Sequence, residues 1–281
     1  GARAVEEGER ALALSREHGL AELEAYVLND ISRAYASVGR PDDAFRTFEV
    51  AYERWQALGN EPMMTDVLGI WSQGRLLRGD PVGAEPLARE GLAIGQRIGN
   101  PWAQAFNSYG LAFALWEQGR EEEALPLFWT TAEWATQAGF PSLAASTAVL
   151  LRWLLHTHGR SDTDRDRLAA ILDAAGEVAH GDQLRRLWRG LDSYFAGDFA
   201  AAYQAVAEEF VVDYNRDGPH AVTMALIPPT IALAAGHPAE ALAAIDRLLA
   251  DMARFGFTTQ HGDAYRPVSY THLTLPTNRE V

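Results

Sequence analysis

Glycine recurs along the chain at a nearly constant interval of about 40 residues, in two interleaved series. The first series comprises Gly39, Gly79, Gly119, Gly159, Gly197 and Gly236. The second series, displaced by half a period, comprises Gly19, Gly59, Gly99 and Gly139 and continues less regularly with Gly181, Gly218 and Gly256. A fixed period of about 20–50 residues is typical of stacked-repeat proteins. The spacing therefore predicts an array of repeats rather than separate compact domains.

The segments between the glycines have the composition of helices. Each is about 20 residues long and rich in Ala, Leu, Glu and Arg, which are strong helix formers. Glycine readily adopts the left-handed backbone that ends a helix. The fold class predicted is therefore all-α, an α-solenoid of about six antiparallel helix pairs with a period near 40 residues. The predicted repeat domain covers 1–266, with units at 1–19 (partial), 20–59, 60–99, 100–139, 140–180, 181–218, 219–257 and 258–266 (partial).

Three further positions repeat with the first glycine series. An alanine follows five residues after the glycine: Ala44, Ala84, Ala124, Ala202 and Ala241. Four residues further on lies an apolar side chain: Phe48, Ala88, Phe128, Val206 and Ile245. A small residue or proline lies seven residues before the glycine: Ser32, Ser72, Ala112, Gly190 and Pro229. Small residues at fixed sites on paired helices are where the backbones approach closely, so we expect these sites to be buried helix crossings.

The fourth unit departs from the pattern. Asp164 lies at its alanine position, and Arg152 replaces the small residue. We expect a longer connection there, a following helix that begins near Asp164, and the main bend of the array.

The same region contains residues that resemble metal ligands. The carboxylates of Asp162, Asp164 and Asp166 alternate as in a calcium-binding loop, and Asp173 occupies the twelfth position. However, Arg167 replaces the glycine that such a loop requires. We favour an acidic helix N-terminus capped by Ser161 or Asp162. His156 and His158 lie two residues apart, and such residues do not share one helix face. We therefore predict no metal site.

The repeated positions resemble the tetratricopeptide repeat (TPR), and five of the six units match its arrangement of small residues followed by Ala-x3-Phe. Ala44 with Phe48 and Ala124 with Phe128 match it most fully. The usual period of that family is about 34 residues, whereas HEAT-type repeats have periods nearer 40; both families stay open, and the motif favours the TPR. The resemblance implies a right-handed superhelix. Longer TPR units of this kind are similar to those of large bacterial signalling proteins, including maltose-regulator-like transcriptional activators and nucleotide-cyclase or ATPase multidomain proteins.

The TPR resemblance also implies which residues face a partner, because the first helix of each unit lines the concave surface in that family. Mapped onto this chain, the partner-facing positions are Asn29, Arg33, Asp66, Gln73, Tyr109, Phe113, Trp116, Trp153 and His156. The first two units present polar groups there, and the third and fourth present aromatic groups. Aromatic side chains beside polar ones are typical of a groove that anchors a peptide. The alternative is that neighbouring repeats bury these aromatic side chains.

Composition excludes several functional classes. The chain has no cysteine, so thiolate chemistry is absent. All 24 basic residues are arginine, which excludes a P-loop lysine and is typical of a GC-rich bacterial coding sequence. A net charge of −14 disfavours nucleic-acid contact. No apolar run reaches the length of a membrane span, and no nucleophile elbow or zinc-protease motif occurs. We therefore expect a cytoplasmic protein that is not an enzyme and has no catalytic residues, cofactor, metal or membrane partner.

The last residues, 267–281, lack the helical pattern of the rest and resemble a translated sequencing adaptor. We therefore expect a non-native or disordered tail that makes few buried contacts and whose deletion leaves the melting temperature unchanged. The final helix, near 258–265, is expected to be a truncated seventh unit. Without a capping helix, the apolar face of the sixth unit should be exposed: Leu242, Ile245, Leu248, Leu249 and Met252.

The predicted function is protein–protein interaction. We expect a scaffold that binds a protein, a peptide or another domain of the same chain within a larger bacterial signalling or transcription-regulatory protein. The alternative is an effector-sensing region that controls an attached ATPase, cyclase or DNA-binding domain. A closed, aromatic-lined cavity in the third and fourth units would favour a small effector, whereas an open groove would favour a polypeptide.

Overall fold

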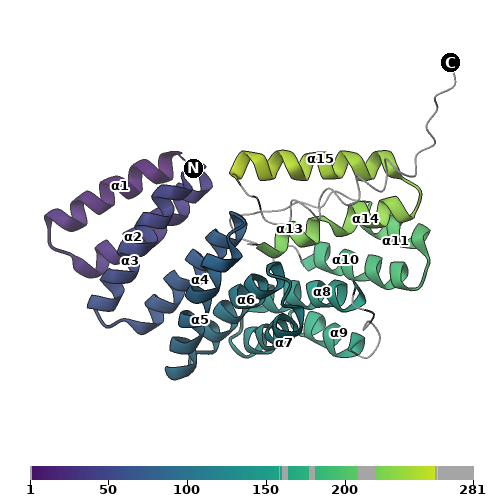
Figure 1. Ribbon diagram of the computed structural model, residues 1–281, viewed down its shortest axis with the longest axis horizontal. Helices are drawn as coiled ribbons and strands as arrows, with labels where there is room; N and C mark the ends of the chain where they lie inside the picture. The colour runs from purple at the N-terminus through teal and green to yellow at the C-terminus, as the bar shows by residue number, and fades with distance from the viewer. Residues whose placement is uncertain are drawn as a thin grey trace, which may run out of the picture.

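The computed structural model describes residues 2–157, 159, 164–176, 181–207, 219–256 and 258, and its secondary structure in these ranges is all-helical. Figure 1 shows the helices following one another along an arc from purple α1 to teal α9, after which the green and yellow helices run back toward α4. Consecutive helices pack against each other as pairs through most of this path. The chain is thus an all-α, solenoid-like repeat.

The first half of the array is highly regular. Its helices are α1 (Ala2–Glu17), α2 (Ala21–Ser37), α3 (Pro41–Ala57), α4 (Glu61–Leu77), α5 (Pro81–Arg97), α6 (Pro101–Glu117), α7 (Glu121–Gln137) and α8 (Pro141–Thr157). Each helix from α2 to α8 has 17 residues. The predicted pairs in the first three units are therefore α2–α3, α4–α5 and α6–α7.

Glycine, proline and short polar residues set this regular length. Glycines of both series have positive φ, for example 74° at Gly39 and 66° at Gly59, so they end the preceding helices as predicted. Prolines at the first helical position begin α3, α5, α6 and α8, where the missing N–H costs no hydrogen bond. The side chains of Asn60, Asp80 and Asn100 accept hydrogen bonds from the first turns of α4, α5 and α6.

The second half is less regular. Its described helices are α9 (Arg165–Ala174), α10 (Gly181–Phe195), α11 (Phe199–Val206), α13 (Pro219–Ala225), α14 (Ile227–Ala234) and α15 (Pro238–Phe255). The helix expected near Asp164 begins at Arg165, as α9, and has only 10 residues. It ends at Gly176, which has a positive φ of 63°, whereas Gly181 of the predicted second series lies buried at the start of α10. The predicted turn at Gly181 is therefore wrong, and Gly218 lies outside the described residues.

The repeated small positions form the helix crossings. All five repeated alanines are buried, and so are the five apolar and five small residues that repeat with them. Close approach requires some of these sites to stay small: a Cβ added at Gly190 would lie 2.6 Å from Val206 Cγ1. A continuous core follows from these crossings, and it runs from the end of α4 through α14.

The sixth unit packs back against the second. The backbone N–H of Thr258 donates to the carbonyl of Leu77 at 2.8 Å, and the Arg78 guanidinium donates to the carbonyl of Gly256 at 2.9 Å. The α13 helix contacts α4 and, with α15, forms an apolar cluster beside Leu77. Figure 1 shows this return of the yellow α15 and green α13 toward blue α4.

This return overturns the expectation of an exposed apolar face on α15. Ile245, Leu248 and Met252 are buried, Leu249 is partly buried against the same cluster, and Leu242 is half-buried. They pack against α13 and Leu77, so α13 and the end of α4 cover this face. The truncated seventh unit and the tail at 267–281 lie outside the described residues, apart from Thr258.

Candidate functional site

The predicted polar positions of the first two units come together between α2 and α4. Asn29 Nδ2 donates to Asp66 Oδ2 at 2.7 Å, and the Arg33 guanidinium lies 3.7 Å from the same oxygen. Asn29 is 4% exposed, whereas half of the Arg33 side chain is exposed. Burial raises the pKa of the Asp66 carboxyl, while the Asn29 hydrogen bond and the Arg33 charge oppose that shift. Gln73, the fourth predicted residue on these helices, has a buried Nε2 with no described hydrogen-bond partner.

The predicted aromatic patch of the third unit is not an exposed surface. Tyr109 is 2% exposed and Phe113 1%, so the expectation that they face a partner across an open groove is wrong. The Phe113 ring packs edge-on against Tyr109 and against Phe128, each at 5.0 Å between centroids. Trp116 is partly buried against Phe128. The physical reason is that α4, α5 and α7 all pack on α6, whose many small residues admit them closely.

The predicted residues of the fourth unit contact the fifth unit. The His156 ring stacks on Phe195 at 3.6 Å between centroids, and Trp153 lies 6.3 Å from Tyr194. Both predicted residues are partly buried. They therefore help to join α8 to α10, and their partner-binding role stays a prediction.

Arg152 brings a charge into the core at the position where other units have a small residue. It is 3% exposed, its NH2 group donates to Asp192 Oδ1 at 2.9 Å, and its guanidinium lies over the rings of Trp188 and Phe195. Arg165 of α9 also donates to Asp192, at 2.6 Å from NH2 and 3.0 Å from Nε. A buried guanidinium requires such a counter-charge, so Asp192 of α10 is tied to both helices of the fourth unit.

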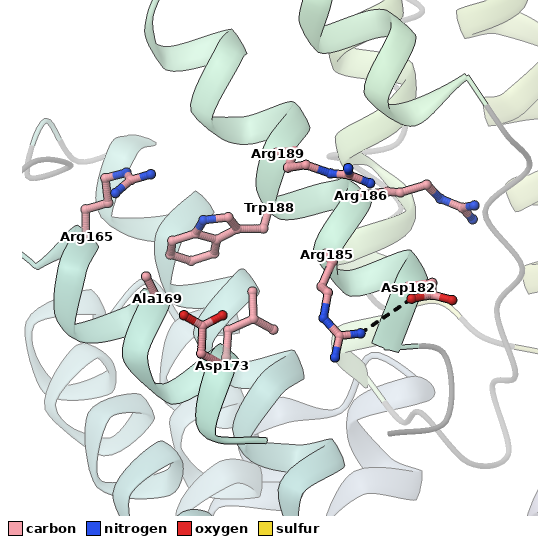
Figure 2. Close-up of a pocket in the computed structure, with 9 residues that line it drawn as sticks. Arg165, Ala169, Asp173, Asp182, Arg185, Arg186, Trp188 and Arg189 are labelled. Atoms are coloured by element: carbon pink, nitrogen blue, oxygen red, sulfur yellow. Dashed lines mark hydrogen bonds and ion pairs between the residues drawn. The ribbon is translucent and has the colours of Figure 1, made fainter. Parts of the chain in front are cut away.

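An open pocket of about 800 Å³ lies between α9 and α10 (Figure 2). In the upstream units the second helix packs closely on the first helix of the next unit, but α9 and α10 make few close contacts in the part that the structure describes. Arg165, Ala169, Leu172 and Asp173 line the pocket from α9. Asp182, Arg185, Arg186, Trp188 and Arg189 line it from α10. The pocket thus occupies the break in the repeat.

The charge of the pocket is opposite to that of the chain. Four arginines face two aspartates there, whereas the whole chain has a net charge of −14. The Arg185 guanidinium is held by the Gly176 carbonyl at 2.5 Å and by Asp182 at 3.4 Å. Hydrogen bonds to Asp192 raise the pKa of Arg165. Arg189 is exposed and forms no ion pair with any described residue. The arrangement can bind carboxylates or other anions.

The break in the repeat was predicted from the sequence, but the pocket was not. Asp164 and Arg152 marked the irregular unit, and the structure places the open space beside it. The basic face of α10 was present in the sequence as Arg185, Arg186 and Arg189, a spacing that puts Arg185 and Arg189 on one side of a helix. A group of arginines at that spacing in an otherwise acidic chain was the sequence signal that could have predicted the pocket.

The carboxylates that resembled a calcium loop do not form a metal site in the described part of the chain. No group of three or more His, Asp or Glu side chains is placed to hold a metal ion in those residues. The Asp166 carboxyl instead lies beside the Arg165 guanidinium at 3.2 Å. Asp162 and His158 lie outside the described residues.

Comparison with known proteins leaves the family open. No protein-family model matches the chain, and no curated protein matches it in sequence. The TPR resemblance therefore rests on the repeated small and apolar positions alone. Across the described helices, none combines the length and the apolar character that a membrane crossing needs.

Proposed function

We propose that this chain is a TPR-like scaffold that binds another polypeptide, either a separate protein or another domain of a larger bacterial signalling or transcription-regulatory protein. The observation that carries the proposal is the open, arginine-lined pocket between α9 and α10. Its walls combine guanidinium groups with the apolar surface of Ala169, Leu172 and Trp188. Arginine and tryptophan are enriched where proteins recognise one another.

The shape and chemistry of the pocket favour a polypeptide over a small effector. Sites for small molecules are mostly enclosed and apolar. Here the pocket is open and largely charged, while Tyr109 and Phe113 lie in the core rather than around a cavity. An effector-sensing function would need an enclosed site, so we place it second.

The proposed function is binding rather than catalysis. Arg165 and Arg185 are both engaged by acceptors of the chain itself, which fixes the positions of their guanidinium groups at the pocket. A base beside a nucleophile, which most acid–base or covalent mechanisms require, is not among the residues that line the pocket. We therefore assign the pocket residues to recognition.

Photo-crosslinking in the source cells tests this proposal. A photoreactive amino acid replaces Asp173, an exposed residue at the pocket, in the full-length protein; the control places it at exposed Glu49 on α3. We expect a polypeptide adduct, identified by mass spectrometry, at the Asp173 position and none at Glu49. Absence of an adduct at both positions, together with a melting temperature raised by a small-molecule extract of the cells, would support the effector-sensing alternative instead.

A further inference from the structure

Two of the three arginines on α10, Arg185 and Arg189, lie on one face of the helix. Arg185 and Arg189 are four residues apart, so they project from the same side, separated by about 6 Å along the helix axis. Asp182 lies one turn before Arg185 on the same side and is almost fully exposed. Alternate side chains of an extended polypeptide point to one side and lie about 6.5–7 Å apart. The pitch of the arginines therefore matches carboxylates at alternate positions of an extended segment.

The pocket also has a direction. Figure 2 shows Arg165 and Arg189 toward one end of the pocket and Asp173, Asp182 and the Arg185 guanidinium toward the other, with the Trp188 ring between the two ends. Because α9 ends and α10 begins at the acidic end, the two helices present their charges in the same order. An acidic segment is therefore attracted more strongly at the Arg165 and Arg189 end, where no aspartate lines the pocket, than at the Arg185 end, where Asp173 and Asp182 oppose it. Its register in the pocket is therefore restricted.

The α9 wall of the pocket fits the residues that lie between the carboxylates of such a segment. Ala169 and Leu172 of α9 face the pocket and provide a small apolar surface. In an extended segment, residues between the carboxylates point away from α10 and therefore toward α9. Small or apolar residues at those positions bury some apolar area without adding a charge near Asp173.

We propose that the α9–α10 pocket binds an extended polypeptide segment with Asp or Glu at alternate positions, separated by small apolar residues. Its carboxylates pair with Arg185 and Arg189 and, at the far end, approach Arg165. The occupant is a segment of another protein or domain, so this inference rests on the proposed function. Arg165 and Arg185 are partly exposed, and Arg189 is exposed and forms no ion pair with the described residues, so all three are accessible to it.

A peptide-binding experiment on the whole chain tests this inference. The probe is a fluorescein-labelled decapeptide of alternating Asp and Ala, measured by fluorescence anisotropy. Its comparison is a block peptide of five Asp followed by five Ala, which has the same charge. We expect the alternating peptide to bind at least threefold more tightly. We also expect Arg185→Gln with Arg189→Gln to weaken its binding about tenfold or more, as lost charge-assisted hydrogen bonds do.

A matched variant separates the pocket from the general effect of charge. Arg46→Gln with Arg97→Gln removes two exposed arginines of the regular units, and we expect less than a twofold change in binding. Arg189→Gln alone, at an exposed residue with no described ion pair, tests the pocket even if the double variant folds poorly.

Four results would overturn the inference: no binding of the alternating peptide, equal affinity for the block peptide, equal losses in the two double variants, or displacement of the probe by inorganic tripolyphosphate at a lower concentration than by the unlabelled peptide. The last would identify a compact polyanion as the ligand. A polypeptide adduct at the Asp173 position that persists in the Arg185→Gln and Arg189→Gln variant would show that this inference fails while the scaffold function stands.

Discussion

The regular units and the junction between the fourth and fifth units are both built from paired helices. Their packing differs: it is closed in the regular units and open at the junction. From α2 to α8, equal helices cross at Ala, Ser and Gly, so each crossing is closed. At the junction, Arg152 and Asp164 replace two of those small residues, α9 is short, and α9 separates from α10 to leave a pocket. This repeat leaves open space where its packing pattern is interrupted, because the closed crossings of the regular units leave no room for a ligand.

Matched leucine substitutions are expected to give the largest difference in the free energy of unfolding between the two regions. Leu115 and Leu172 are both buried in the same core cluster, but Leu115 lies in the closed core of α6, whereas Leu172 also borders the pocket. Leu→Ala changes in cores cost about 2–5 kcal/mol, and the cost rises with the cavity left behind. We expect Leu115→Ala to lie at the upper end of that range and Leu172→Ala at or below its lower end, since the space beside Leu172 is already open. Urea denaturation measures both, and equal losses would mean that the junction packs as tightly as the regular units.

The next largest loss of stability is expected from removing Asp192, the counter-charge that two arginines share at the junction. Asp192→Ala takes a partner from both Arg152 and Arg165, and we expect a loss of about 2–4 kcal/mol, because the Arg152 guanidinium is buried. Asp182→Ala is the control: its carboxylate is exposed, so we expect a change below about 1 kcal/mol. Thermal unfolding distinguishes the two. A neutral Asp192→Ala would show that this charge does not hold the junction together.

The alanine position of the repeat should respond differently in the two regions. Ala124→Leu overpacks a closed crossing and is expected to cost about 1–3 kcal/mol. Asp164→Leu changes the corresponding position of the fourth unit, which is half-buried, and we expect a cost below about 1 kcal/mol. Chemical denaturation of the two single variants is sufficient to compare them. If Asp164→Leu were the more damaging, the alignment of the fourth unit with the others would be incorrect.

The smallest effect concerns Asp66 within the regular units. Because burial raises its pKa in the folded state, the folded protein binds the proton more tightly than the unfolded chain. Asp66 therefore adds stability as the pH falls through its folded pKa toward about 4, and that stability is lost as the pH rises. We expect Asp66→Asn to be neutral or slightly stabilising at pH 7. The variant should lack the gain in stability that the unchanged chain shows as the pH falls.

Asp43→Asn provides the control of opposite sign. Hydrogen bonds from Arg40 and Arg46 lower the pKa of Asp43, so its contribution is present at neutral pH and is lost as the pH falls through the folded pKa. Melting temperatures of both variants between pH 4 and pH 7 measure the two slopes. Parallel slopes would contradict the burial of the Asp66 carboxyl.

The features predicted from the sequence were those that depend on local residues. Glycine spacing located the turns of the regular units, and the repeated alanines located their crossings, because each is set within one helix pair. The exposure of Tyr109 and Phe113 depends on how many neighbours reach α6, which a pattern along one helix does not report. The pocket depends in turn on the distance between α9 and α10, and the burial of α15 depends on a contact with α4 far away in the sequence.

That distant contact changes how the array is expected to fold. In an open solenoid, stability is a sum over neighbouring repeats, and folding can begin anywhere and spread. Here the bond from Arg78 to Gly256 joins residues 178 positions apart. Such a contact requires closing a long loop, which slows folding and links the sixth unit to the second. The sixth unit should therefore fold late and unfold together with the units around α4, rather than fray as an independent end.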